Sequence, residues 1–211
     1  MINLSKSGML VLTFLLAFAG IGYGQSNIPT KEEQISAAVS PAPEKMQQQA
    51  KVLGYTKNGE LVKLREGNNQ LVCLADNPQQ SNFHVACYHK DLEPFMKRGR
   101  ELKAQGMSRK KVDSLRREAI KSGEISMPRK PMALYSLTGS ANSFNYTTGQ
   151  VMNASPLYVV YVPFETEAST GLAGKPTTKG APWIMEPGTP WAHIMVITGR
   201  DIGKKSGSGE K

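Results

Sequence analysis

The strongest constraint on the fold lies between residues 51 and 89, where short strand-like runs alternate with turn signals. Asn58-Gly59 separates the first two runs, and Asn-Gly at this spacing favours a tight hairpin because both turn positions must tolerate positive φ. We therefore predict an antiparallel meander. Its strands are expected at Val52–Thr56, Glu60–Arg65, Leu71–Ala75 and Phe83–His89.

The only two cysteines of the chain, Cys73 and Cys87, fall in the third and fourth runs. An even count in an exported chain favours one disulfide, which these runs can form if they are neighbours. A zinc site with His84 and His89 is the alternative, but the spacing fits no familiar finger and alternation places His84 on the other face from Cys87 and His89. We expect the disulfide and no metal or other cofactor.

A basic helical hairpin is predicted over residues 91–123. Asp91 and Ser108 can cap the two helices, and Gly106 and Gly123 can end them. Ten Lys or Arg and only three acids lie between Lys97 and Lys121, in a chain with formal net charge +9. These cations could contact an anionic surface, or they could form an ordinary solvated face. The candidate contacts are Arg98, Arg100, Arg109, Lys110, Arg116, Arg117 and Lys121.

Strand patterns return after the hairpin, at Ala133–Thr138, Leu157–Val162 and His193–Thr198. The middle run is apolar on both alternating faces, which is typical of a central strand covered on each side. The fold class predicted is α+β: a mainly antiparallel sheet of about six or seven strands, with the helical hairpin inserted between its halves.

The N-terminus reads as a secretory signal. Lys6 precedes an apolar run from Met9 to about Ile21, which is short for a membrane span, and small residues follow. We expect a signal peptide over residues 1–24, a flexible leader over 25–40, one domain over 41–200 and a disordered tail over 201–211. No membrane-spanning segment is expected after cleavage.

Reactive and aromatic side chains gather between Ala181 and Thr198, a stretch that holds both tryptophans of the protein. Trp183 and Trp191 bracket a Pro-Gly turn and could bind a ligand with His193, or they could be buried and close the sheet. His193 and Glu186 are the candidate acid/base pair, although a histidine here more commonly bonds a loop carbonyl. No nucleophile motif accompanies them.

Two segments carry a resemblance. Leu64-Arg65-Glu66-Gly67 with Asn69 and Cys73, and Pro182-Trp183 through Pro187-Gly188-Thr189-Pro190 to His193, together resemble a pattern in uncharacterised exported bacterial proteins. The resemblance implies a periplasmic-type setting and no activity.

These patterns favour an exported periplasmic or extracellular protein without enzymatic activity, which binds a ligand or partner. An anionic envelope polymer or another envelope protein is the expected partner. Specific nucleic-acid binding is not expected, because the only aromatic residue of the hairpin, Phe95, lies on its apolar side and cannot stack on bases. The alternative is a hydrolase-type or metal-dependent enzyme that uses His193 with a nearby acid.

Overall fold

The computed structural model describes residues 28–198 and residue 202. The expected signal peptide lies outside these residues, as does the expected tail apart from Ile202, which forms an isolated antiparallel bridge with Ala154. None of the helices within the described part of the chain is long and apolar enough to cross a membrane.

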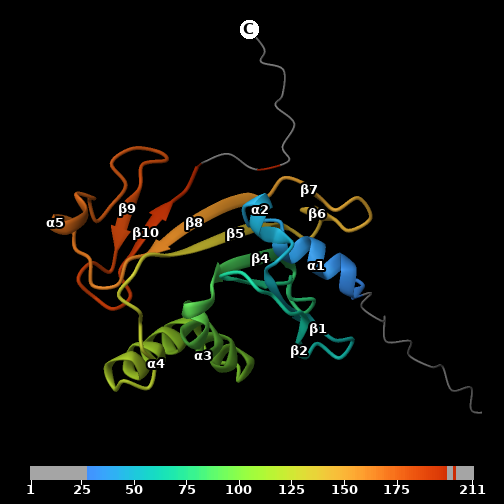
Figure 1. The fold of residues 1–211 in the computed structure, drawn as a ribbon, viewed down its shortest axis with the longest axis horizontal. Coiled ribbons are helices and arrows are strands. Elements are labelled where there is room, and N and C mark those ends of the chain that lie inside the picture. Colours follow the sequence, from blue (N-terminus) through green and yellow to red (C-terminus); the bar gives the residue numbers. More distant parts are fainter. Residues whose placement is uncertain (1–27, 199–201, 203–211) are drawn as a thin grey trace, which may run out of the picture.

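The protein has an α+β fold built on one mixed sheet of eight strands, in the order β2-β1-β3-β4-β5-β8-β10-β9 (Figure 1). The strands are β1 (Lys51–Tyr55), β2 (Leu61–Arg65), β3 (Leu71–Leu74), β4 (Asn82–His89), β5 (Met132–Ser140), β8 (Ser155–Tyr161), β9 (Trp183–Met185) and β10 (His193–Val196). A separate two-stranded sheet pairs β6 (Phe144–Asn145) with β7 (Gln150–Val151). The expected count of six or seven strands is therefore too low, because β9 and the β6–β7 pair lie in segments that read as loops.

The predicted meander is wrong in one connection. β1 pairs with β2 on one side and, in parallel, with β3 on the other. The chain passes close to the start of β1 between β2 and β3, where the backbone amides of Asn68 and Asn69 donate to the Gln49 carbonyl. Gly67 allows this crossing, since a Cβ there would lie 2.1 Å from the backbone nitrogen of Lys51.

Part of the expected leader forms a packed helix. Residues 31–39 are α1 (Lys31–Val39), which begins with a capping box: Thr30 accepts from the backbone of Glu33, and the Glu33 side chain accepts from the backbone of Thr30. Ala37 and Ala38 are fully buried. The ordered domain therefore starts before residue 41, because a short apolar face at the end of α1 suffices to dock it on the sheet. The next helix, α2 (Glu44–Gln47), is entered through Pro43.

Two consecutive helices, α3 (Glu93–Ala104) and α4 (Arg109–Lys121), lie between β4 and β5 and pack against each other. Ser108 caps α4 as expected, with its side chain accepting from the backbone of Lys111. The start of α3 differs from the prediction. A short 3-10 turn, η1 (Lys90–Leu92), precedes it, and the His89 side chain, not that of Asp91, caps this turn. A last short helix, α5 (Glu167–Thr170), follows β8.

The two faces of the sheet carry different layers (Figure 1). Cys73 and Cys87 are opposite each other on β3 and β4 and pack beneath α1, and their predicted disulfide is present. The neighbouring Val72 and Tyr88 point to the other face, where they pack with Phe95 of α3 and Ala119 of α4. Because side chains alternate between the two faces along β3 and β4, these strands contribute residues to the core on each face of the sheet.

Candidate functional site

The segment that joins β9 to β10 lies against α3 and α4, so the aromatic stretch and the basic helices form one region. Trp191 packs edge-to-face on Phe95, with ring centroids 4.8 Å apart. Two arginines of α4 flank the same indole: Arg116 at 5.0 Å and Arg117 at 4.4 Å from its centroid. Cation–π contacts of this kind contribute about 0.5–2 kcal/mol each. Trp191 is therefore half-buried in the contact between α4 and the β9–β10 connection.

Arg116 belongs to this packing more than to the surface. Its guanidinium lies 3.4 Å from the centre of the Phe95 ring, and its side chain is only 13% exposed. Gly99 of α3 leaves room for it, because a Cβ there would come within 3.2 Å of the guanidinium. Arg116 is thus poorly placed to reach an external anion.

Glu186 is held by Arg117 in a two-pronged ion pair, with N–O distances of 2.6 and 3.1 Å. These hydrogen bonds lower the pKa of Glu186. The Glu186 backbone has φ 54°, in the left-handed region, and its carbonyl accepts from the Thr189 hydroxyl at 2.8 Å. Such a conformation costs roughly 1 kcal/mol or more for a residue other than glycine. The Pro-Gly turn and the ion pair fix this carboxylate on α4.

His193 begins β10 and bonds a loop carbonyl. Its Nδ1 lies 2.7 Å from the Trp191 carbonyl oxygen, which can only accept, so Nδ1 carries the proton. Its ring packs against Tyr161, with centroids 5.4 Å apart. Burial lowers the pKa of His193, while the Trp191 carbonyl and the Glu186 carboxylate act in the opposite direction. At neutral pH the imidazole is therefore neutral and oriented by the backbone.

Three other candidate cations differ in how closely they are paired with acidic side chains. Arg100 donates to the Tyr88 hydroxyl and to Glu93, both at 2.7 Å, and is largely buried. Arg98 lies 4.0 Å from Glu124. Arg109 is almost fully exposed and lies 4.0 Å from Asp113. Only Arg109 of these three presents its charge freely to solvent.

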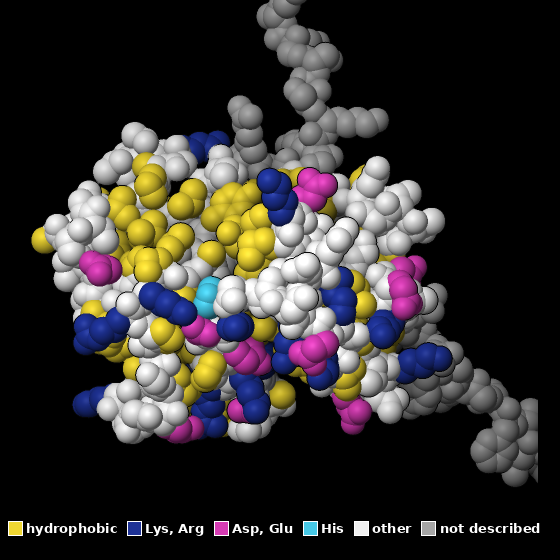
Figure 2. All heavy atoms as spheres, in the orientation of Figure 1, with side chains coloured by type: hydrophobic (Ala, Val, Ile, Leu, Met, Phe, Trp, Pro, Cys, Tyr) yellow, Lys and Arg dark blue, Asp and Glu magenta, His cyan; other side chains and the backbone are white. Residues whose placement is uncertain are grey.

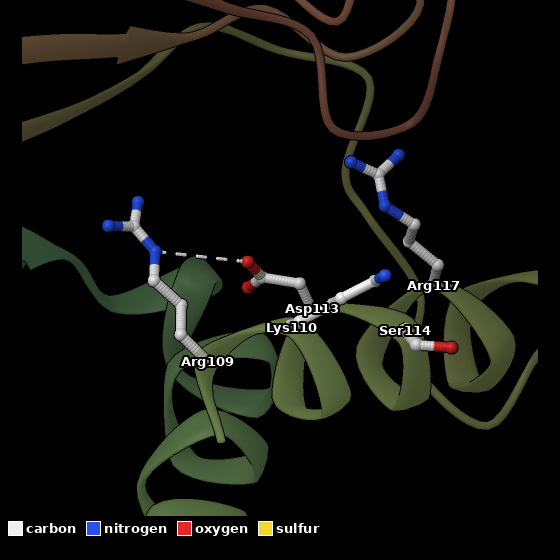
Figure 3. A pocket seen from close by; sticks show the side chains of 5 residues that line it. All are labelled: Arg109, Lys110, Asp113, Ser114 and Arg117. Atoms are coloured by element: carbon white, nitrogen blue, oxygen red, sulfur yellow. Dashed lines mark ion pairs between the residues drawn. The ribbon is translucent and has the colours of Figure 1, made fainter.

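A shallow, open pocket lies on α4 beside the Arg117–Glu186 pair (Figure 3). It is lined by Arg109, Lys110, Asp113, Ser114 and Arg117. Figure 3 shows the Arg109 and Arg117 side chains directed to the same side of the helix, with Asp113 between them. Three cations, one acid and a hydroxyl make this a net positive site that can donate hydrogen bonds to a carboxylate or phosphate oxygen.

Four lysines of the two helices have no carboxylate within 4.0 Å among the residues that the structure describes: Lys103, Lys110, Lys111 and Lys121. All four are exposed. The first turn of α4 holds Lys110 and Lys111 with Arg109 and no acid. Cations there oppose the helix dipole, at roughly 0.3–1 kcal/mol each, so the start of α4 is a strongly positive surface.

The remaining sequence candidates lie elsewhere. Trp183 is half-buried in β9, opposite Met195 of β10, and does not line the pocket. The His84 ring bonds Thr138 at 2.9 Å and His89 caps η1. Among the described residues, no three His, Cys, Asp or Glu side chains are grouped to hold a metal ion.

Sequence reasoning did not single out Ser114 or the pairing of Asp113 with Arg109. The signal was present, since residues 109, 113 and 117 recur every four positions and lie along one side of α4. The partner of Arg117 could not be found in this way, because Glu186 is 69 positions away.

Comparison with protein-family models, with curated proteins and with solved structures gives no match to this chain.

Proposed function

We propose that this chain is an exported, nonenzymatic binding domain. In this proposal α3 and α4 form its basic helical hairpin. The outer side of α4 binds an anionic envelope polymer. The observation that carries this proposal is the group of exposed lysines on α4, Lys110, Lys111 and Lys121, for which no described carboxylate is a partner. Polymer carboxylates or phosphates would compensate these charges.

The surface fits a repeating anion better than a single small one. Lys110, Ser114, Arg117 and Lys121 are spaced so that they follow one side of the helix. That stripe is about 16 Å long, at ~1.5 Å per residue. The open pocket overlaps most of this stripe, since Lys110, Ser114 and Arg117 also line it. A chain of anions can lie along the stripe, with one group in the pocket. Export is supported by the disulfide, which is typical of oxidising compartments.

The hydrolase or metal-enzyme alternative with His193 has less support. Both carboxylate oxygens of Glu186 are paired with Arg117, and His193 Nδ1 is bonded to a backbone carbonyl. Within the described residues, the His193 ring contacts the Trp191 carbonyl and the Tyr161 ring, and not a serine, threonine or cysteine side chain that it could activate as a nucleophile.

Retention on an anionic matrix tests the proposal. The protein should bind phosphocellulose, and elution should require less salt after Lys110→Glu, Lys111→Glu and Lys121→Glu are combined. The matched control is Lys31→Glu, Lys45→Glu and Lys57→Glu, which changes the net charge equally but on α1, on α2 and in the turn between β1 and β2. If both triple variants elute at the same salt concentration, only net charge matters and α4 is not the binding surface.

A further inference from the structure

A second surface, independent of α4, lies on the face of the sheet that carries α1. Alternation and register place six apolar side chains of β5, β8 and β10 on this face: Ala133, Tyr135, Tyr158, Val160, Ile194 and Val196. We call them the apolar sheet face. Every one of them is only partly buried. Figure 2 shows hydrophobic side chains gathered over this part of the sheet, to the left of α2.

The apolar sheet face lies between two parts of the protein that already cover this side of the sheet. On one side, Met46 of α2 and Tyr135 pack against the cluster beneath α1. On the other side, Leu172, Val160 and Ile194 pack against the buried cluster of Val162, Ile184 and Ala192. Between these borders the sheet carries no helix in the described part of the chain. A contiguous apolar area of this kind usually marks an interaction site.

The dimensions of this strip favour a helix as the occupant. It is three strands wide, which is about 10–14 Å at a strand spacing of ~4.8 Å. An α-helix with its side chains is about 10–12 Å across. α1 packs on the same face in the way that such a helix would. One further helix would complete the layer.

Two lysines at the border of the apolar sheet face favour a helix that carries acidic residues. Lys175 and Lys179 are exposed in the segment that follows Leu172, and no described carboxylate lies within 4.0 Å of either. Lys179 precedes Gly180, where a Cβ would lie 3.7 Å from the Ile197 carbonyl, so this segment borders the end of β10. A second copy of this chain, with net charge +9, would bring like charge to the same border.

We propose that the apolar sheet face docks an amphipathic α-helix of another protein, with apolar residues on one side and Asp or Glu at its margins. Apolar contact with Tyr158, Val160 and Ile194 would hold the helix. Its acids would meet Lys175 and Lys179. This inference does not depend on polymer binding by α4.

A synthetic helix tests the proposal. The probe is an 18-residue peptide with Leu at positions spaced three and four apart and Glu elsewhere. A peptide of the same composition with shuffled Leu positions and one with Lys in place of Glu serve as comparisons. The amphipathic acidic peptide should bind at least tenfold more tightly than either, with amide chemical shifts changing at β8 and β10. Equal binding by all three peptides, or shifts confined to α4, would overturn the proposal.

Two variants separate docking from a loss of folding. Val160→Thr with Ile194→Thr keeps β-branched residues and should weaken the peptide at least tenfold. Lys175→Glu with Lys179→Glu changes only an exposed segment and should make the Lys peptide the tighter ligand. No reversal in this second variant would contradict the charge selection.

Two further measurements test other occupants of the apolar sheet face. Concentration-dependent dimers in sedimentation, lost in the Val160→Thr, Ile194→Thr variant, would assign the face to a second copy and overturn the proposal. Binding of oleate that excludes the peptide, with no preference among the three peptides, would assign it to an acyl chain. The Lys110→Glu, Lys111→Glu, Lys121→Glu variant should bind the acidic peptide as the unmodified chain does.

Discussion

Arg117 of α4 and Glu186 of the β9–β10 connection, 69 positions apart, form a two-pronged ion pair that ties the C-terminal part of the sheet to the basic helices. The Arg117 guanidinium also lies 4.4 Å from the Trp191 ring centre. One arginine therefore joins both the charged and the aromatic side of this contact. The stretch between Ala181 and Thr198, in which the reactive and aromatic side chains gather, therefore serves mainly to hold the sheet and the helices together.

Separating this pair should lower stability by a small, pH-dependent amount. The pair is partly exposed, with side-chain exposures of 45% and 35%, so the coupling free energy between Arg117→Ala and Glu186→Gln should be about 0.5–1 kcal/mol in urea unfolding. The pKa of Glu186 is lowered in the folded state, so the coupling should be complete above about pH 4.3 and disappear as the pH falls through the folded pKa. Coupling that does not change with pH would show that it is not electrostatic.

The imidazole of His193 should titrate below the ordinary histidine value of about 6.5, because burial lowers its pKa. The Glu186 carboxylate raises the same pKa, so Glu186→Gln should lower it further. Ring chemical shifts followed by NMR between pH 4 and 8 measure both effects. Because the folded pKa lies below the unfolded one, stability due to His193 is lost as the pH falls from about 6.5 to the folded value. An increase of the pKa in Glu186→Gln would contradict the described geometry.

Much of the fold follows from local sequence signals. The Asn58-Gly59 turn, the Ser108 cap and the two cysteines each indicated an element or contact that the structure contains. These features depend on neighbours in the sequence or on a single pairing. The sequence also showed the capping signal at Thr30 and Glu33. It did not show that the helix packs on the sheet, which depends on the buried Ala37 and Ala38.

What could not be predicted depends on contacts between distant residues. The parallel pairing of β1 with β3 requires a backbone crossing at Gly67 that no periodicity encodes. Two acidic partners of the basic helices could not be predicted either, because Glu124 and Glu186 lie outside the helices that hold Arg98 and Arg117. The apolar run in β8 correctly predicted a central strand, but its Tyr158 and Val160 side is only partly covered.

Removing the disulfide should destabilise the domain without changing its fold. Cys73 and Cys87 are both fully buried, and their sequence separation is 14. The loop-closure model gives about 3 kcal/mol for a loop of this size. The variant Cys73→Ala with Cys87→Ala should lose about that much in guanidinium unfolding. The unmodified protein under dithiothreitol should lose a similar amount, whereas addition of dithiothreitol to the double variant should change nothing.

Arg100 should matter for stability and not for retention on an anionic matrix. It donates to both Tyr88 and Glu93, and burial raises the pKa of the Tyr88 hydroxyl, which remains a neutral donor to Glu93. Arg100→Ala should therefore cost about 1.5–3 kcal/mol, since hydrogen bonds to charged groups are lost. Lys103→Ala, on the same helix but exposed, should cost less than about 0.5 kcal/mol. Equal losses in urea unfolding would show that the buried network adds no stability.

One added methyl group at the crossing between β2 and β3 should destabilise the domain, because it would meet backbone atoms. In Gly67→Ala the new Cβ would lie 2.1 Å from the Lys51 nitrogen and 2.6 Å from the Ala50 carbonyl carbon, both backbone atoms that cannot rotate away. Relief requires a shift of β1, and overpacking of this kind costs about 1–3 kcal/mol.

Gly106→Ala is the matched control for this substitution. Gly106 has nothing within 4 Å of the added Cβ, but its φ of 77° leaves backbone strain of roughly 1 kcal/mol. The two variants should therefore differ in thermal unfolding, with Gly67→Ala the less stable. Hydrogen exchange should then be faster at β1 and β3 in Gly67→Ala but unchanged there in Gly106→Ala. Unchanged exchange at β1 in both variants would mean that the parallel β1–β3 pairing does not depend on the absence of a side chain at residue 67.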